Sequence, residues 1–273
     1  MTKSRFPVTR NGVTLLELLV VLMILSIILT AAVKTWDVTL ERGRAETTSR
    51  KLNQLVTAIV GEPDYIVAGQ RVDFGFVGDV GRLPANLQEL MVFPISPPES
   101  SLWRGPYLRS TFNESPDGFR IDGWGDTIAY NRDSLFLRSY GRRGLADPTR
   151  WQTAYLPYKA SDLTNNEVSG QIVDVRGEPP PADSVRIIEG LKVILYYPRE
   201  GKLFADERSR DAAANFDYDV GIPQGTHRLV AMYIDIYNPP VETTMTTADV
   251  TVYPGIGARH VRMRLNLDWN DKP

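Results

Sequence analysis

The sequence predicts an α+β protein in which a long N-terminal transmembrane helix packs on a small α/β head, followed by an antiparallel β-sandwich domain. Three patterns indicate this order: an apolar run near the N-terminus, apolar residues at helical spacing up to residue 60, and alternating strands from residue 168. The chain has 273 residues, 42% of them hydrophobic, which suffices for a core in each of two domains.

A membrane-spanning segment is predicted from Val13 to Val33. Its only charged residue is Glu17, and at 1.5 Å per residue such a helix crosses a hydrocarbon core of about 30 Å. Residues 1–12 include three basic residues, Lys3, Arg5 and Arg10, and no acidic one. Because basic residues flanking a span stay on the inner side, this predicts residues 1–12 in the cytoplasm and the rest of the protein in the periplasm. A secretory signal peptide has a shorter apolar region, of about 7 to 15 residues. A plain signal anchor remains an alternative, because hydrophobicity and flanking charge do not distinguish it.

The segment Gly12–Val21, which reads GVTLLELLVV, carries a specific resemblance. It is similar to the class III signal of type IV pilins and type II secretion pseudopilins, except that Val13 stands where the family usually has Phe. The resemblance implies that a prepilin peptidase cleaves after Gly12 and methylates the amine of Val13. It also implies assembly through Glu17 with other pilin or pseudopilin subunits, on an inner-membrane assembly platform.

The position of Glu17 has a physical consequence of its own. A carboxylate inside an apolar span costs on the order of 2.5 to 3.5 kcal/mol on insertion, so a partner is expected. A free amine at Val13, with a typical pKa of about 7.7 to 8.0, would be mostly positive and lie one helical turn away. By the family resemblance, the amine of an incoming subunit meets the carboxylate of its neighbour. A pair within one subunit, or a carboxylate that reaches the membrane interface, is the alternative.

The helix is predicted to continue beyond the membrane to residue 60. Apolar residues such as Trp36, Leu52 and Ile59 recur three or four positions apart among charged ones, and Gly61 with Pro63 ends the pattern. Gly43 is a candidate bend. The predicted organisation is a leader (1–12), a helix (13–60), a head (61–158), a linker (159–167) and a β-sandwich (168–273).

Several short sequence motifs in the predicted head resemble those of the major pseudopilin of type II secretion. They occur in the same order, with an insertion between Leu108 and Asp122. The residues that carry this pilin-like resemblance are Asp79, Gly81, Pro84, Trp103, Gly105, Pro106, Tyr107, Asp122, Trp124 and Gly125. Glycine and proline fix turns and the aromatic rings supply apolar area, so a structural role is expected. Related pseudopilins carry an acidic calcium loop where Arg142 and Arg143 stand here, and two guanidinium groups oppose calcium.

The C-terminal region shows the alternation of an antiparallel β-sandwich. The predicted strands are Val168–Val175, Leu191–Tyr197, His227–Tyr237, Ala248–Tyr253 and Arg259–Leu267. The amino-acid sequence at residues 169–179, 193–195 and 222–230 resembles that of transthyretin-like modules, which are found beside carboxypeptidases and in bacterial surface proteins. That resemblance implies an accessory or recognition domain, which binds or spaces and carries no catalytic group.

Several other functions lack support in the sequence. A net charge of −2 is not that of a nucleic-acid-binding protein, and without cysteine there is no thiolate chemistry. His227 and His260 lie in predicted strands without the spacing of a metal pair, so no metal site is predicted. An acidic cluster is expected to be a solvated loop; its members are Asp206, Asp211, Asp217 and Asp219. No nucleotide motif or catalytic grouping occurs, so neither an enzyme nor a cofactor is predicted.

Two functions from different classes follow. The first is a structural subunit, minor or specialised, of a type IV pilus or a type II secretion pseudopilus, processed after Gly12. The alternative is a membrane-anchored periplasmic binding protein that uses its C-terminal β-sandwich. Processing at Gly12 and the need for Glu17 distinguish the two.

Overall fold

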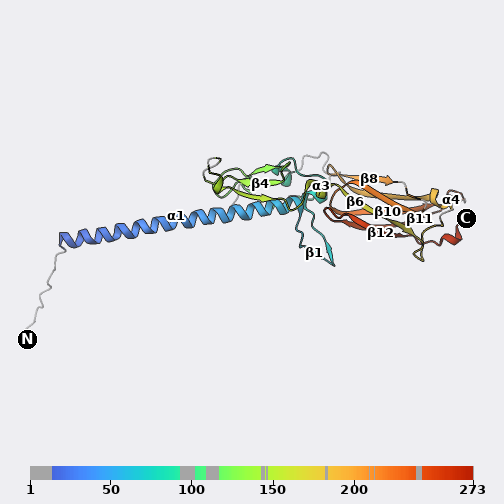
Figure 1. Cartoon of the computed structure of the whole chain (residues 1–273), viewed down its shortest axis with the longest axis horizontal. Helices are drawn as coiled ribbons and strands as arrows, with labels where there is room; N and C mark the ends of the chain where they lie inside the picture. Colours follow the sequence, from blue (N-terminus) through green and yellow to red (C-terminus); the bar gives the residue numbers. More distant parts are fainter. Residues whose placement is uncertain are drawn as a thin grey trace, which may run out of the picture.

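The computed structural model describes residues 14–92, 102–108, 117–142, 145, 147–181, 184–208, 210–211, 213–237 and 242–272. A single long helix leads into a small head, and a β-rich domain continues in the same direction (Figure 1). The start of the helix and the end of the described chain therefore lie at opposite ends of the molecule. Gly12, Val13 and Arg143 fall outside the described residues.

Helix α1 runs without interruption from Leu15 to Val60. Thr14 caps it, because its Oγ1 accepts a hydrogen bond from the N–H of Glu17 at 3.2 Å. It continues through Gly43, the candidate bend, and ends at Gly61, whose φ of 82° favours glycine. Its described residues before Glu41 are exposed, whereas Leu52, Leu55 and the last three residues of the helix are buried. The second half of α1 thus forms the core of the head.

The head is built around this buried half of α1. A three-stranded antiparallel sheet covers it, in the order β3 (Ala129–Asn131), β4 (Phe136–Ser139), β5 (Gln152–Tyr155). The smaller elements are the hairpin β1 (Ile66–Val67) and β2 (Gln70–Arg71), helix α2 (Gly75–Val80), and the 3-10 turns Leu87–Leu90, Gly118–Arg120 and Pro148–Arg150. One apolar core joins α1, α2, β3 to β5 and Leu163.

The C-terminal domain contains two sheets that share one core. The first has the order β11 (Thr243–Val252), β10 (Gly225–Ile234), β7 (Leu191–Arg199), β8 (Lys202–Arg208), and all its pairs are antiparallel. The second has the order β12 (Ala258–Arg264), β6 (Asn166–Val173), β9 (Asn215–Ile222). Helix α4 (Val185–Gly190) and the 3-10 turn Trp269–Asp271 complete the domain.

Two predictions for this domain were wrong. The sandwich is not wholly antiparallel, since β12 pairs with β6 in parallel. After β11 the chain turns and crosses to the other sheet, so it reaches β6 in the same direction. The acidic cluster is not one loop either, because Asp206 lies in β8 while Asp217 and Asp219 lie in β9. Buried Phe216 and Tyr218 alternate with the two aspartates of β9, which point outward.

The predicted linker 159–167 is also structured. Residues Ala160–Thr164 form helix α3, Leu163 is fully buried in the head core, and β6 begins at Asn166. Its polar composition suggested a loop, but Asp162 completes a capping arrangement at Lys159 and Leu163 supplies the apolar contact. The two domains are therefore joined by a packed helix.

Candidate functional site

The N-terminal half of α1 presents a long run of exposed apolar side chains. Its large apolar side chains from Leu15 to Val33 are roughly half or more exposed, at 45 to 83%. This is the one helix in the described residues that is long and apolar enough to cross a membrane. The hydroxyls of Ser26 and Thr30 donate to the carbonyls of Leu22 and Ser26, each at 2.8 Å. Apart from Glu17, the described span is therefore compatible with lipid or with other apolar helices.

Glu17 lies on this exposed surface, in the first turn of α1. No described side chain forms an ion pair with it, and its predicted partner, the amine of Val13, falls outside the described residues. Its backbone N–H donates to Thr14 Oγ1, so the start of the helix holds the backbone of Glu17 in place.

One group of the head motif residues connects helix α2 to the segment 103–107. Asp79 Oδ2 accepts a hydrogen bond from the hydroxyl of Tyr107 at 2.7 Å. Burial raises the pKa of both Asp79 and Tyr107. The ring of Tyr107 packs edge-on against Trp103, whose indole N–H donates to the carbonyl of Glu89 at 3.1 Å. Gly105–Pro106 is a cis peptide, and Pro84 is buried. These contacts are those of a structural assembly.

The second group attaches the head to α1. Asp122 is buried, and its carboxylate accepts from the N–H groups of Trp124 and Asp126 and from Ser139 Oγ. The indole N–H of Trp124 donates to Glu41 on α1 at 3.0 Å, which lowers the pKa of Glu41. Gly125 occupies the turn with a φ of 94°. Asp122 thus shapes the loop that brings Trp124 onto the helix.

Arg142 lies after β4, in the segment where the family resemblance raised the question of a calcium loop. Its guanidinium pairs with Glu41 at 3.2 Å, so the residue braces α1. In the part of the chain that the structure describes, no group of three or more His, Asp or Glu residues is placed to hold a metal. His227 and His260 lie in separate strands, β10 and β12.

The sequence did not predict the residues that join the two domains. The side-chain amide of Gln224 donates to the carbonyls of Val60 and Phe74, at 2.9 and 3.0 Å. Arg82 bridges Glu89 in the head and Glu200 in the C-terminal domain, at 2.8 and 2.7 Å. The contacts that cross between the domains, from Gln224 to Val60 and Phe74 and from Arg82 to Glu200, join residues more than a hundred positions apart. No local pattern could reveal them.

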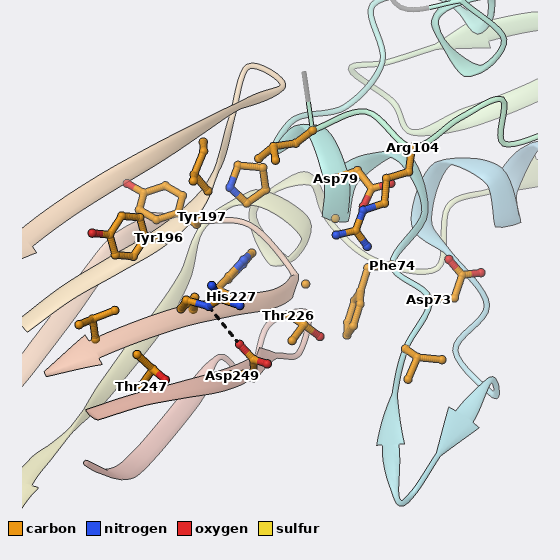
Figure 2. A pocket seen from close by; sticks show the side chains of 18 of the residues that line it. Asp73, Phe74, Asp79, Arg104, Tyr196, Tyr197, Thr226, His227, Thr247 and Asp249 are labelled. Atoms are coloured by element: carbon orange, nitrogen blue, oxygen red, sulfur yellow. Dashed lines mark ion pairs between the residues drawn. The ribbon is translucent and has the colours of Figure 1, made fainter. Parts of the chain in front are cut away.

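A cavity of about 980 Å³ opens between the two domains. Figure 2 shows Phe74, Asp79 and Arg104 of the head facing the outer side of the sheet that contains β7, β10 and β11. Tyr196, Arg228 and Asp249 form one row across these strands, and Arg228 pairs with Asp249 at 3.7 Å (Figure 2). Outward positions of a strand look alike in sequence whether they face a cavity or open solvent, so this site was missed.

His227 is buried beside this cavity. Its Nε2 lies 2.7 Å from the carbonyl of Pro223 and donates to it, while no described atom donates to its Nδ1. Burial lowers the pKa of His227 from 6.5 to about 4. The folded protein therefore protonates His227 less readily than the unfolded chain does. The free energy of unfolding is unaffected by this histidine above pH 6.5, and it decreases as the pH falls from 6.5 toward 4.

We expect this effect to be measurable by urea unfolding of the full chain in detergent. Between pH 7.5 and pH 5 the buried histidine costs roughly 2 kcal/mol of unfolding free energy. The control is His227→Gln, which can donate to Pro223 but does not titrate, so its loss over the same interval is smaller by that amount. Equal losses in the two proteins would show that His227 does not govern acid stability.

Comparison with known proteins agrees with the N-terminal pattern. The prokaryotic N-terminal methylation motif matches residues 9–33. This match confirms the prediction of a prepilin-type N-terminus, and it supports a type IV pilin-like or pseudopilin-like protein with a membrane anchor at that coarse level. Neither the curated proteins nor the solved structures include a match to the chain.

Proposed function

We propose that the protein is a structural subunit, minor or specialised, of a type IV pilus or a type II secretion pseudopilus. The observation that carries the proposal is the exposed apolar face of α1 from Leu15 to Val33, with Glu17 in its first turn, inside a methylation motif. A helix of this kind is stable in lipid and equally able to pack against other apolar helices.

In this proposal the protein begins in the inner membrane, with residues 14–33 in lipid and both domains in the periplasm. A prepilin peptidase cleaves after Gly12 and methylates Val13. The assembly platform then transfers α1 from lipid into a bundle of pilin or pseudopilin helices, where Glu17 meets the amine of a neighbouring subunit. The motif residues of the head act as structural contacts rather than as catalytic groups, so the proposed role is not enzymatic.

The first experiment is the N-terminal mass of the protein from cells with and without the prepilin peptidase. We expect the wild-type protein to begin at methylated Val13 and the peptidase mutant to retain residues 1–12. A protein that keeps its N-terminus in both strains would rule out a processed subunit and leave α1 as an anchor only.

A second candidate function is ligand binding by a membrane-anchored protein, and the cavity between the domains favours it. Ligand sites are common at domain junctions and combine apolar walls with a few polar groups, as Phe74, Tyr196 and Asp249 do here. Thr247→Trp would place a large ring in this cavity and narrow it. If that variant abolishes complementation of a deletion strain while Glu17→Ala complements fully, the binding function replaces the filament function.

A further inference from the structure

We propose that the membrane-facing end of the head binds the anionic phospholipid headgroups of the bilayer surface through four arginines. We call them the basic rim: Arg42 and Arg44 on α1, Arg142 after β4, and Arg150 before β5. The proposal needs only that α1 spans the membrane, and it does not depend on assembly into a filament.

The geometry of α1 places the basic rim close to the lipid surface. The predicted span ends at Val33, and Arg42 follows nine positions later in the same unbroken helix, about 13 Å further along it. The headgroup layer occupies roughly the first 5 to 8 Å beyond the hydrocarbon. An extended arginine side chain directed along the helix crosses the remaining distance.

The head brings its own arginines down to the same level. Glu41 on α1 forms an ion pair with Arg142 at 3.2 Å and accepts a hydrogen bond from Trp124. The two head loops that carry Arg142 and Trp124 therefore lie against the helix turn that contains Arg42. A groove of about 520 Å³ lies there between α1 and the head, and its lining includes Arg42 and Arg150. In Figure 1 this end of the head overhangs the free part of α1.

The charges of the basic rim are only partly neutralised. Arg44 and Arg142 share the single carboxylate of Glu41, at 3.5 and 3.2 Å, and Arg150 lies 3.9 Å from Asp147. Within the described residues Arg42 forms no ion pair, and Lys34 adds a further exposed cation nearer the membrane.

Acidic side chains at the same end of the head reduce the excess of positive charge. Asp37 lines the groove, and Asp126 is exposed in the loop that carries Trp124. The remaining attraction is therefore modest. It suffices to orient the head, because α1 already tethers the rim beside the bilayer at a high effective concentration.

Trp36 supports this placement of the membrane surface. Its side chain is 69% exposed, three positions beyond the predicted end of the span. Tryptophan is enriched at the headgroup level, where its ring meets both apolar and polar groups. The basic rim lies just outside that level, in the zone where anionic headgroups attract arginine and lysine.

The test uses the full chain in lipid nanodiscs, made of phosphatidylcholine alone or with added phosphatidylglycerol. The chain lacks cysteine, so Thr149→Cys gives a single fluorophore beside the groove, and Thr247→Cys gives a matched label on the distant C-terminal domain. Nitroxide groups on the lipid headgroups quench a fluorophore that approaches the surface. The charge variant is Arg42→Gln with Arg150→Gln, and its control is Arg262→Gln with Arg264→Gln, two exposed arginines of β12.

We expect strong quenching at position 149 in the anionic nanodiscs, weaker quenching without phosphatidylglycerol, and none at position 247. Each arginine removed from the basic rim lowers the ratio of docked to undocked heads by roughly fivefold, and the control pair leaves it unchanged. Quenching at position 149 that is equal with and without phosphatidylglycerol, and equal in the wild-type protein and the charge variant, overturns the proposal. Unchanged quenching in the charge variant alone also overturns it.

Discussion

Glu17→Ala is expected to give a stable, membrane-inserted protein that no longer enters filaments. The carboxylate lies exposed in the first turn of α1 and has no ion-pair partner among the described residues, so its removal breaks no ion pair within that part of the chain. Insertion becomes easier by about 2.5 to 3.5 kcal/mol, since a charge leaves the apolar span. Assembly loses the group proposed to pair with the amine of the next subunit. The measurement is the fraction of the protein recovered in sheared filaments relative to the membrane.

Two control variants separate this role from local effects. Glu46→Ala removes a carboxylate from the same helix, where it forms only an exposed pair with Arg50 at 3.5 Å, and should assemble normally. Thr14→Ala removes the cap that holds the N–H of Glu17 and costs about 1 kcal/mol of helix stability, without removing the charge. Normal recovery of the Glu17→Ala protein in filaments would exclude the assembly role of this carboxylate.

Gly81→Ala is expected to destabilise the junction of the two domains severely. Gly81 ends α2 with a φ of 80°, and a Cβ atom there would lie 2.1 Å from the carbonyl oxygen of Pro198 in β7. Relief of that overlap requires the C-terminal domain to move away from the head. The nearby backbone bond from the N–H of Gly201 to the carbonyl of Val80, and the Arg82–Glu200 pair, would then be lost together.

The matched control is Gly125→Ala, which has the same backbone problem without the contact. Its φ is 94°, and no atom lies within 4 Å of the added Cβ. We expect a cost of about 1 to 2 kcal/mol for Gly125→Ala, from backbone strain alone. Gly81→Ala should exceed this by several kcal/mol, in line with an overpacked core. Urea unfolding and limited proteolysis between the domains would detect the difference, and equal costs would show that Pro198 yields freely.

The local patterns of the chain predicted its N-terminal helix well. The apolar span, the isolated Glu17 and the stop at Gly61 are all local features, and α1 from Leu15 to Val60 follows them closely. The strands β6, β7, β10, β11 and β12 were also recognised, because each alternates core and outward residues. In the C-terminal domain β8 and β9 were missed. The residues of β8 are mostly exposed, so it has no alternation to recognise, and the aspartates of β9 were interpreted as part of an acidic loop.

The sequence by itself determined that this protein has a methylation-type membrane helix continuous with a head, because a helix and a membrane span depend on neighbouring residues only. The tertiary structure decided the rest. It brought Gln224 to Val60, packed Leu163 into the head, directed β12 parallel to β6 and opened a cavity between the domains. Each of these depends on groups far apart in the chain, whose approach is set by the packing of the whole fold and by no local pattern.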